Sequence, residues 1–191
     1  MNLPNKITIA RIVLIPVIIL FLSVNFDLGT LQVGSSVISV SEVIAVLVFI
    51  VAASTDGLDG YIARKRKLVT NLGKLLDPLA DKLLITAALV SLVEMQRLDA
   101  WIAVIIIGRE FAVTGLRLIA VEKGYVIAAS KLAKWKTSIQ IVALVSLMLN
   151  NVPFSFVQIP FAQIAIWAAV IITVWSGVDY FVKNREILVK A

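Results

Sequence analysis

The sequence contains no cysteine and no histidine among its 191 residues. Without cysteine there can be no disulfide, zinc-thiolate site or cysteine nucleophile. The side chains left for metal binding or proton transfer are chiefly carboxylates, whose oxygens suit hard cations such as magnesium, manganese or calcium. Charge is scarce as well, because 16% of the residues are charged and 60% are hydrophobic, whereas about a quarter of a soluble domain is charged. This excess of apolar residues predicts a protein that faces lipid.

Six apolar runs predict six transmembrane helices. They cover approximately residues 7–24, 40–63, 76–96, 99–121, 135–150 and 157–182, and a spanning helix needs about 20 such residues. We therefore predict an all-α integral membrane protein, built as one domain over residues 1–191. The first run begins with Lys6 and Arg11 and lacks a small-residue cleavage site after it, which indicates a retained span. The Gly- and Ser-rich segment 25–40 is predicted to be an outer loop.

The basic residues fall on one side of these predicted spans. They are Lys6, Arg11, Arg64, Lys65, Arg66, Lys67, Lys74, Arg117, Lys123, Lys131, Lys134, Lys136, Lys183, Arg185 and Lys190, whereas the opposite loops carry only Arg97. Because positive residues stay on the cytoplasmic side, both termini and the loops near 64–75 and 122–134 should be cytoplasmic in a multi-pass protein of the cell membrane. This distribution accounts for the net charge of +6 without nucleic acid as a partner.

Four aspartates lie where two neighbouring predicted helices meet. Asp56 and Asp59 are three residues apart near the end of the second helix, and Asp77 and Asp81 are four apart near the start of the third. Each pair therefore lies on one helical face. Because a short basic turn joins the two helices, we expect them to lie side by side, with the four carboxylates together just inside the cytoplasmic boundary.

Clustered carboxylates repel one another at neutral pH unless cations lie between them. Two divalent ions would balance four negative charges, and a metal pair stabilises both the attacking and the leaving oxygen of a phosphoryl displacement. Magnesium in particular is shared between protein carboxylates and substrate phosphates. The cluster therefore predicts two divalent cations, Mg²⁺ or Mn²⁺, and chemistry on a phosphodiester or pyrophosphate.

The aspartates belong to a longer pattern, Asp56-x2-Asp59-Gly60-x2-Ala63-Arg64-x8-Gly73-x3-Asp77-x3-Asp81. At every position it matches the signature of the CDP-alcohol phosphatidyltransferases, and the sequence resembles this family over essentially its whole length. The pattern defines eight positions within 26 residues, which chance does not explain. The six predicted spans agree with the six-helix fold of the family.

The resemblance implies a role for each of these residues. Asp56, Asp59 and Asp77 would hold one metal ion, and Asp56, Asp77 and Asp81 the second. Asp81 would also remove the proton from the acceptor hydroxyl, with CMP as the leaving group, and a carboxylate base suits a chain without histidine. The CDP site would be lined by Gly60, Ala63, Arg64 and Gly73.

The acceptor has to be inferred from residues outside this pattern. Three segments resemble bacterial family members that use sn-glycerol 3-phosphate: Leu3-Pro-Asn5-x2-Thr8-x2-Arg11, Gly108-Arg109-Glu110 and Lys131-x2-Lys134-x-Lys136-Thr137-x2-Gln140. This implies transfer of the phosphatidyl group of CDP-diacylglycerol to glycerol 3-phosphate, giving phosphatidylglycerophosphate and CMP. The candidate residues for the acceptor phosphate are Thr8, Arg109, Arg117, Lys131, Lys134 and Lys136.

Arg109 lies inside an otherwise apolar predicted span, where an unpaired arginine is costly. It needs a partner, which could be Glu110, an aspartate or a bound phosphate, and arginine can bind phosphate through two donors. Other basic residues can instead contact anionic lipid headgroups. We expect that role for Arg66, Lys67, Lys123, Lys183, Arg185 and Lys190.

Two other classes of protein have to be weighed. A divalent-cation transporter would use the four aspartates for translocation, but they flank a basic cytoplasmic loop and no matching acidic site exists in the second half. A non-catalytic scaffold would have no reason to gather four carboxylates. Among enzymes, the alternative acceptors are inositol phosphate, serine and phosphatidylglycerol. Family members commonly pair, so we expect a homodimer, for which small residues in the third and fourth spans could provide packing.

Overall fold

The computed structural model describes residues 3–24, 26–34, 36–65, 71–122, 131–152 and 154–185, with the backbone alone at 3–4, 56–65, 71–72, 74–75, 122 and 131–134. This part of the chain is mostly helical. The helices are α1 (Leu3–Ser23), α2 (Val40–Lys65), α3 (Asn71–Glu94), α4 (Ala100–Glu122), α5 (Lys131–Met148) and α6 (Phe161–Lys183). Strands β1 (Thr30–Val33) and β2 (Ser36–Ser39) form a hairpin, and the 3-10 helix η1 (Phe154–Val157) precedes α6.

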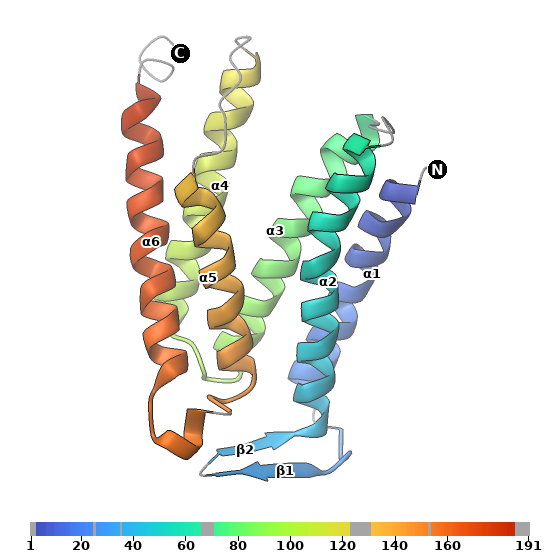
Figure 1. The fold of residues 1–191 in the computed structure, drawn as a ribbon, viewed down its shortest axis with the longest axis vertical. Helices are drawn as coiled ribbons and strands as arrows, with labels where there is room; N and C mark the ends of the chain where they lie inside the picture. The colour runs from blue at the N-terminus through green and yellow to red at the C-terminus, as the bar shows by residue number, and fades with distance from the viewer. Residues whose placement is uncertain are drawn as a thin grey trace.

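Successive helices run in opposite directions, so the connections alternate between the two ends of the molecule (Figure 1). The hairpin and η1 lie at one end, and the start of α1 and the end of α6 lie at the other. α1 packs against α2 and α3, and α6 packs against α4 and α5. Contacts of α3 with α4, and of α5 with α2 and α3, join the two groups. The groups diverge toward the end where α2 stops and α3 begins.

One hydrophobic core connects all six helices, and their outer faces are apolar too. Fully buried core residues, one from each helix in chain order, are Ile18, Phe49, Leu89, Ile106, Leu144 and Ala169. Exposed large apolar residues, again one from each helix, are Val13, Leu47, Val90, Val104, Val142 and Ile171. In the described chain, Asn5–Ser23 and Phe161–Lys183 are long and apolar enough to cross a membrane. Helices that are apolar all round are typical of a membrane protein.

Six helices were predicted and six are present in the described chain, but several of their ends differ. α3 begins at Asn71 instead of residue 76, and α5 at Lys131 instead of 135. The prediction followed the apolar runs alone, whereas these helices start with a polar turn. α6 begins at Phe161 instead of 157, because η1 and Pro160 come first, and proline suits the start of a helix since it lacks a backbone donor.

Residues 25–40 were predicted to form a loop, but residues 30–33 and 36–39 within this segment form a β-hairpin. Thr30 pairs with Ser39 and Val33 with Ser36, so two residues connect the strands. Gly34, with φ +61°, adopts a conformation that favours glycine. A Gly-Ser connection between short segments rich in β-branched residues is a sequence signal for such a hairpin. Over the described residues, the fold is therefore all-α except for this two-stranded sheet.

Arg97 ties several elements together at the hairpin end. Its Nη2 lies 2.7 Å from Glu42 Oε1 on α2, and its Nη1 donates to the Met148 carbonyl at 2.8 Å. Glu42 also forms a capping box with Ser39: the Glu42 amide donates to Ser39 Oγ at 3.1 Å, and the Ser39 amide to Glu42 Oε2 at 3.2 Å. The basic residue of the predicted outer loops thus has a structural role.

Candidate active site

The four aspartates of the signature all lie within helices. Asp56 and Asp59 are on the last turns of α2, and Asp77 and Asp81 are near the start of α3. The helical backbone supports the prediction that each pair shares a face. α2 and α3 do contact one another, although each packs more extensively against α1.

The side chains of Asp56 and Asp59 are outside the described residues, so the predicted four-carboxylate cluster stays a prediction. Among the side chains that are described, no group of three or more acidic residues is close enough to hold a metal ion. Asp77 and Asp81, the two signature aspartates with described side chains, are both partly buried.

A polar stripe on α1 faces these two helices. Asn5, Thr8 and Arg11 are 5%, 0% and 1% exposed. Thr8 Oγ1 donates to Asp77 Oδ1 at 2.7 Å, and Arg11 Nε donates to Thr55 Oγ1 at 3.3 Å, beside Asp56 in sequence. Thr8 was predicted to bind the acceptor phosphate, but the hydrogen bond observed is with a signature aspartate. α1 therefore supports the aspartate region from the side opposite the acceptor candidates on α4 and α5.

A small polar pocket lies between α3, α4 and α5, and Asp81 forms part of its wall. The pocket has a volume of about 30 Å³. Its lining residues are Asp81, Lys82, Ile85, Thr86, Ile107, Glu110, Lys136, Thr137 and Gln140. The same pocket is thus lined by the predicted base, Asp81, and by one predicted acceptor lysine, Lys136. These two residues are far apart in the sequence.

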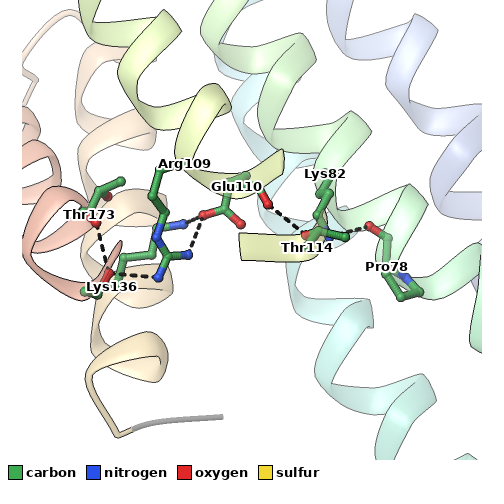
Figure 2. Close-up of polar contacts among 8 residues, drawn as sticks. Pro78, Lys82, Arg109, Glu110, Thr114, Lys136 and Thr173 are labelled. Atoms are coloured by element: carbon green, nitrogen blue, oxygen red, sulfur yellow. Dashed lines mark hydrogen bonds and ion pairs between the residues drawn. The ribbon is translucent and has the colours of Figure 1, made fainter. Parts of the chain in front are cut away.

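Glu110 joins two of the predicted acceptor residues. Its Oε1 forms ion pairs with Lys136 Nζ and, at 3.2 Å, with Arg109 Nη1 (Figure 2). Arg109 Nη2 donates to Ser176 Oγ on α6 at 2.9 Å. The sequence indicated that Arg109 needs a partner, and Glu110 is that partner. One carboxylate against two cations leaves a net positive charge beside the pocket.

The other predicted site residues with described side chains do not line this pocket. Arg109 extends toward α6 and is not among the pocket-lining residues, while Arg117 is exposed and donates from Nε to Tyr180 Oη at 3.2 Å. Gly73 is buried on α3, one helical turn before Asp77. The remaining predicted site residues lie outside the described side chains: Gly60, Ala63, Arg64, Lys131 and Lys134.

Comparison with known proteins identifies the class. The chain belongs to the CDP-alcohol phosphatidyltransferase family, whose model matches residues 1–175. It is 54% identical over 187 residues to a protein of Bacillus subtilis (strain 168), with 98% of this chain and 97% of that protein aligned. That relative is named CDP-diacylglycerol--glycerol-3-phosphate 3-phosphatidyltransferase.

Two more distant relatives carry the same name. The protein from Rickettsia bellii (strain RML369-C) is 39% identical over 181 residues, with 94% of this chain and 93% of the relative aligned. The protein from Haemophilus influenzae is 40% identical over 186 residues, covering 94% of this chain and 91% of the relative. The family resemblance inferred from the aspartate signature is therefore confirmed.

Proposed function

We propose that this protein transfers the phosphatidyl group of CDP-diacylglycerol to sn-glycerol 3-phosphate, producing phosphatidylglycerophosphate and CMP. The observation that carries the proposal is the pocket between α3, α4 and α5 that Asp81 and Lys136 both line. A carboxylate base and a cation are the two groups that a phosphorylated alcohol requires. The names of the relatives support the same acceptor.

The described part of the site fits divalent cations. Asp77 and Asp81 are one helical turn apart, and carboxylate oxygen is the donor that magnesium and manganese prefer. We propose that Asp56, Asp59 and Asp77 hold one ion and Asp56, Asp77 and Asp81 the other. When bound, such ions stabilise negative charge on the attacking and leaving oxygens of a phosphoryl displacement. The proposed CDP-site residues are Gly60, Ala63, Arg64 and Gly73.

In the proposed reaction, an acceptor hydroxyl oxygen forms a bond to the phosphorus that carries the diacylglycerol. The bond from that phosphorus to the bridging oxygen breaks, and CMP leaves with the bridging oxygen. Asp81 accepts the hydroxyl proton, since a carboxylate within hydrogen-bond reach can act as a general base. Lys136 contributes positive charge for the acceptor phosphate, and Arg109, paired to the same Glu110, adds to it.

We further propose that all six helices cross the cell membrane, with both termini in the cytoplasm. The alternating helix directions support this topology, as do the exposed apolar residues on every helix. The basic residues of the predicted cytoplasmic loops support the orientation. The aspartates would then lie close to the cytoplasmic boundary, where CDP-linked headgroups and soluble acceptors meet.

The proposed acceptor is tested by following CMP release from the purified protein in detergent with Mg²⁺ or Mn²⁺ and CDP-diacylglycerol. Glycerol 3-phosphate, inositol phosphate, serine and phosphatidylglycerol are offered separately. We expect release with glycerol 3-phosphate, the acceptor in the names of the relatives, whose phosphate would use the positive charge beside the pocket. Release with inositol phosphate, serine or phosphatidylglycerol instead would contradict the acceptor assignment, and metal binding without CMP release from any alcohol would favour a transporter.

Thr8→Val is expected to lower activity by about 10- to 100-fold and to raise the metal concentration needed for half-maximal activity. Valine keeps the size and branching of threonine but removes the hydroxyl that donates to Asp77 Oδ1 at 2.7 Å. Asp77 would then lose a group that orients it. The measurement is CMP release as a function of Mg²⁺ or Mn²⁺ concentration.

Thr114→Val is the matched control for this change. The Thr114 hydroxyl donates to the Glu110 backbone carbonyl within α4 at 2.7 Å, outside the pocket lining. Its replacement should leave the metal dependence unchanged. An unchanged metal dependence in Thr8→Val would show that the hydrogen bond to Asp77 does not orient a metal ligand.

A further inference from the structure

Gln140 is a buried polar residue that the proposed reaction does not yet use. It lies on α5, one helical turn after Lys136, and is 2% exposed. It lines the same pocket as Asp81. Within the described part of the chain, its Nε2 atom has no hydrogen-bond partner. A buried amide donor without a partner therefore belongs to a residue that lines the same pocket as the proposed base.

A donor in this position is expected to meet a bound group. Buried polar atoms are almost always hydrogen-bonded, and one left without a partner is destabilising. The pocket can hold a small polar group, because its volume of about 30 Å³ exceeds the roughly 10–15 Å³ that one water molecule needs. A hydroxyl group therefore fits this space. Ile85 and Ile107 are the apolar residues of the pocket wall.

We propose that Gln140 determines acceptor specificity by donating a hydrogen bond to a second, non-reacting hydroxyl of the acceptor. This inference rests on the proposed function. Glycerol 3-phosphate carries two neighbouring hydroxyls, one at the reacting end and one on the middle carbon. With the terminal hydroxyl at Asp81, the middle hydroxyl enters the pocket and accepts from Gln140 Nε2. Lys136, one turn away on the same face of α5, remains available to the phosphate end.

This role makes the enzyme selective for an alcohol with adjacent hydroxyls. A site built to hydrogen-bond a substrate hydroxyl rejects an analogue that lacks it, because the buried protein group is then left unpaired. The informative analogue is 3-hydroxypropyl phosphate, which keeps the phosphate and the terminal hydroxyl but has no middle hydroxyl. The wild-type enzyme is expected to prefer glycerol 3-phosphate over this analogue by about 10- to 100-fold in kcat/KM.

The test compares kcat/KM for the two acceptors in the wild type and in Gln140→Met, measured as CMP release with saturating CDP-diacylglycerol. Methionine fills a similar volume without the amide. The kcat/KM of the variant should fall about 10- to 100-fold with glycerol 3-phosphate and change little with the analogue. The ratio of the two kcat/KM values should therefore approach one. A purely structural defect would lower both values alike. The ratio therefore reports recognition of the hydroxyl.

Ser146→Ala is the control on the same helix. Ser146 is 7% exposed, its hydroxyl donates to the Val142 carbonyl, and it does not line the pocket, so the wild-type preference should persist. Equal kcat/KM values for the two acceptors in the wild type would by themselves overturn the proposal. An unaltered preference in Gln140→Met would also overturn it. If the wild type releases no CMP with glycerol 3-phosphate, the proposed function itself fails, and this inference with it.

Discussion

Replacing Asp81 by asparagine is expected to lower CMP release by about 100- to 10,000-fold, the range that general-base catalysis contributes. Asparagine has nearly the size and shape of aspartate but cannot accept the proton of the acceptor hydroxyl. It also removes a negative charge from the proposed metal site. Asp81 borders the pocket that contains Lys136 and Gln140, so the loss should affect the chemical step more than the binding of glycerol 3-phosphate. The measurement is kcat and KM for the acceptor at saturating metal and CDP-diacylglycerol.

Asp99→Asn provides the matched control for Asp81→Asn. Asp99 is exposed in the turn before α4, at the hairpin end of the molecule and far from the ends of α2 and α3 that carry the signature aspartates. The same chemical change there should leave kcat unaltered. Thermal unfolding of both variants in detergent separates a catalytic loss from a folding defect. A folded Asp81→Asn protein that retains most of the wild-type kcat would eliminate Asp81 as the base.

The helices and the aspartate signature were predictable because both depend on local sequence. Apolar runs reveal spans without any knowledge of tertiary contacts. The spacing of Asp77 and Asp81 likewise places them on one face of any helix. Local sequence also showed that Arg109 lies within an apolar span and needs a partner. What it left open was which partner, since Glu110, an aspartate and a phosphate all satisfy the same electrostatic requirement.

The contacts that assemble the pocket were not predictable, because they depend on how helices distant in sequence pack. Thr8 and Asp77 are 69 positions apart, and Glu110 and Lys136 are 26 apart. Helix periodicity specifies which residues share a face but not which helix that face meets. Thr8 was grouped with the acceptor residues through the family-like N-terminal segment, and its contact with Asp77 became apparent only in the structure. Gln140 appeared only as part of a family-like segment, and its buried, unpaired amide became apparent only in three dimensions.

Glu110→Gln is expected to destabilise the protein by about 3–5 kcal/mol, the usual effect of breaking a buried ion pair by removing one partner. Lys136 is 5% exposed and Arg109 is half-buried, and the Glu110 carboxylate contacts both. A neutral glutamine leaves two neighbouring cations repelling each other in an apolar setting. For a chain of this length the midpoint of thermal unfolding should fall by about 6–20 °C. The measurement is thermal unfolding in detergent in the absence of substrates.

Two further variants test whether repulsion between the unpaired cations causes the loss of stability in Glu110→Gln. Glu94→Gln makes the same substitution at an exposed glutamate that accepts a hydrogen bond from Ser23 at 2.6 Å, and it should change stability little. Adding Lys136→Met to Glu110→Gln removes one of the two unpaired cations, so the double variant should be more stable than Glu110→Gln alone. Its activity with glycerol 3-phosphate should nevertheless be low, because Lys136→Met removes the cation at the pocket. Equal stability of Glu110→Gln and the wild type would mean that Glu110 does not hold these cations in place.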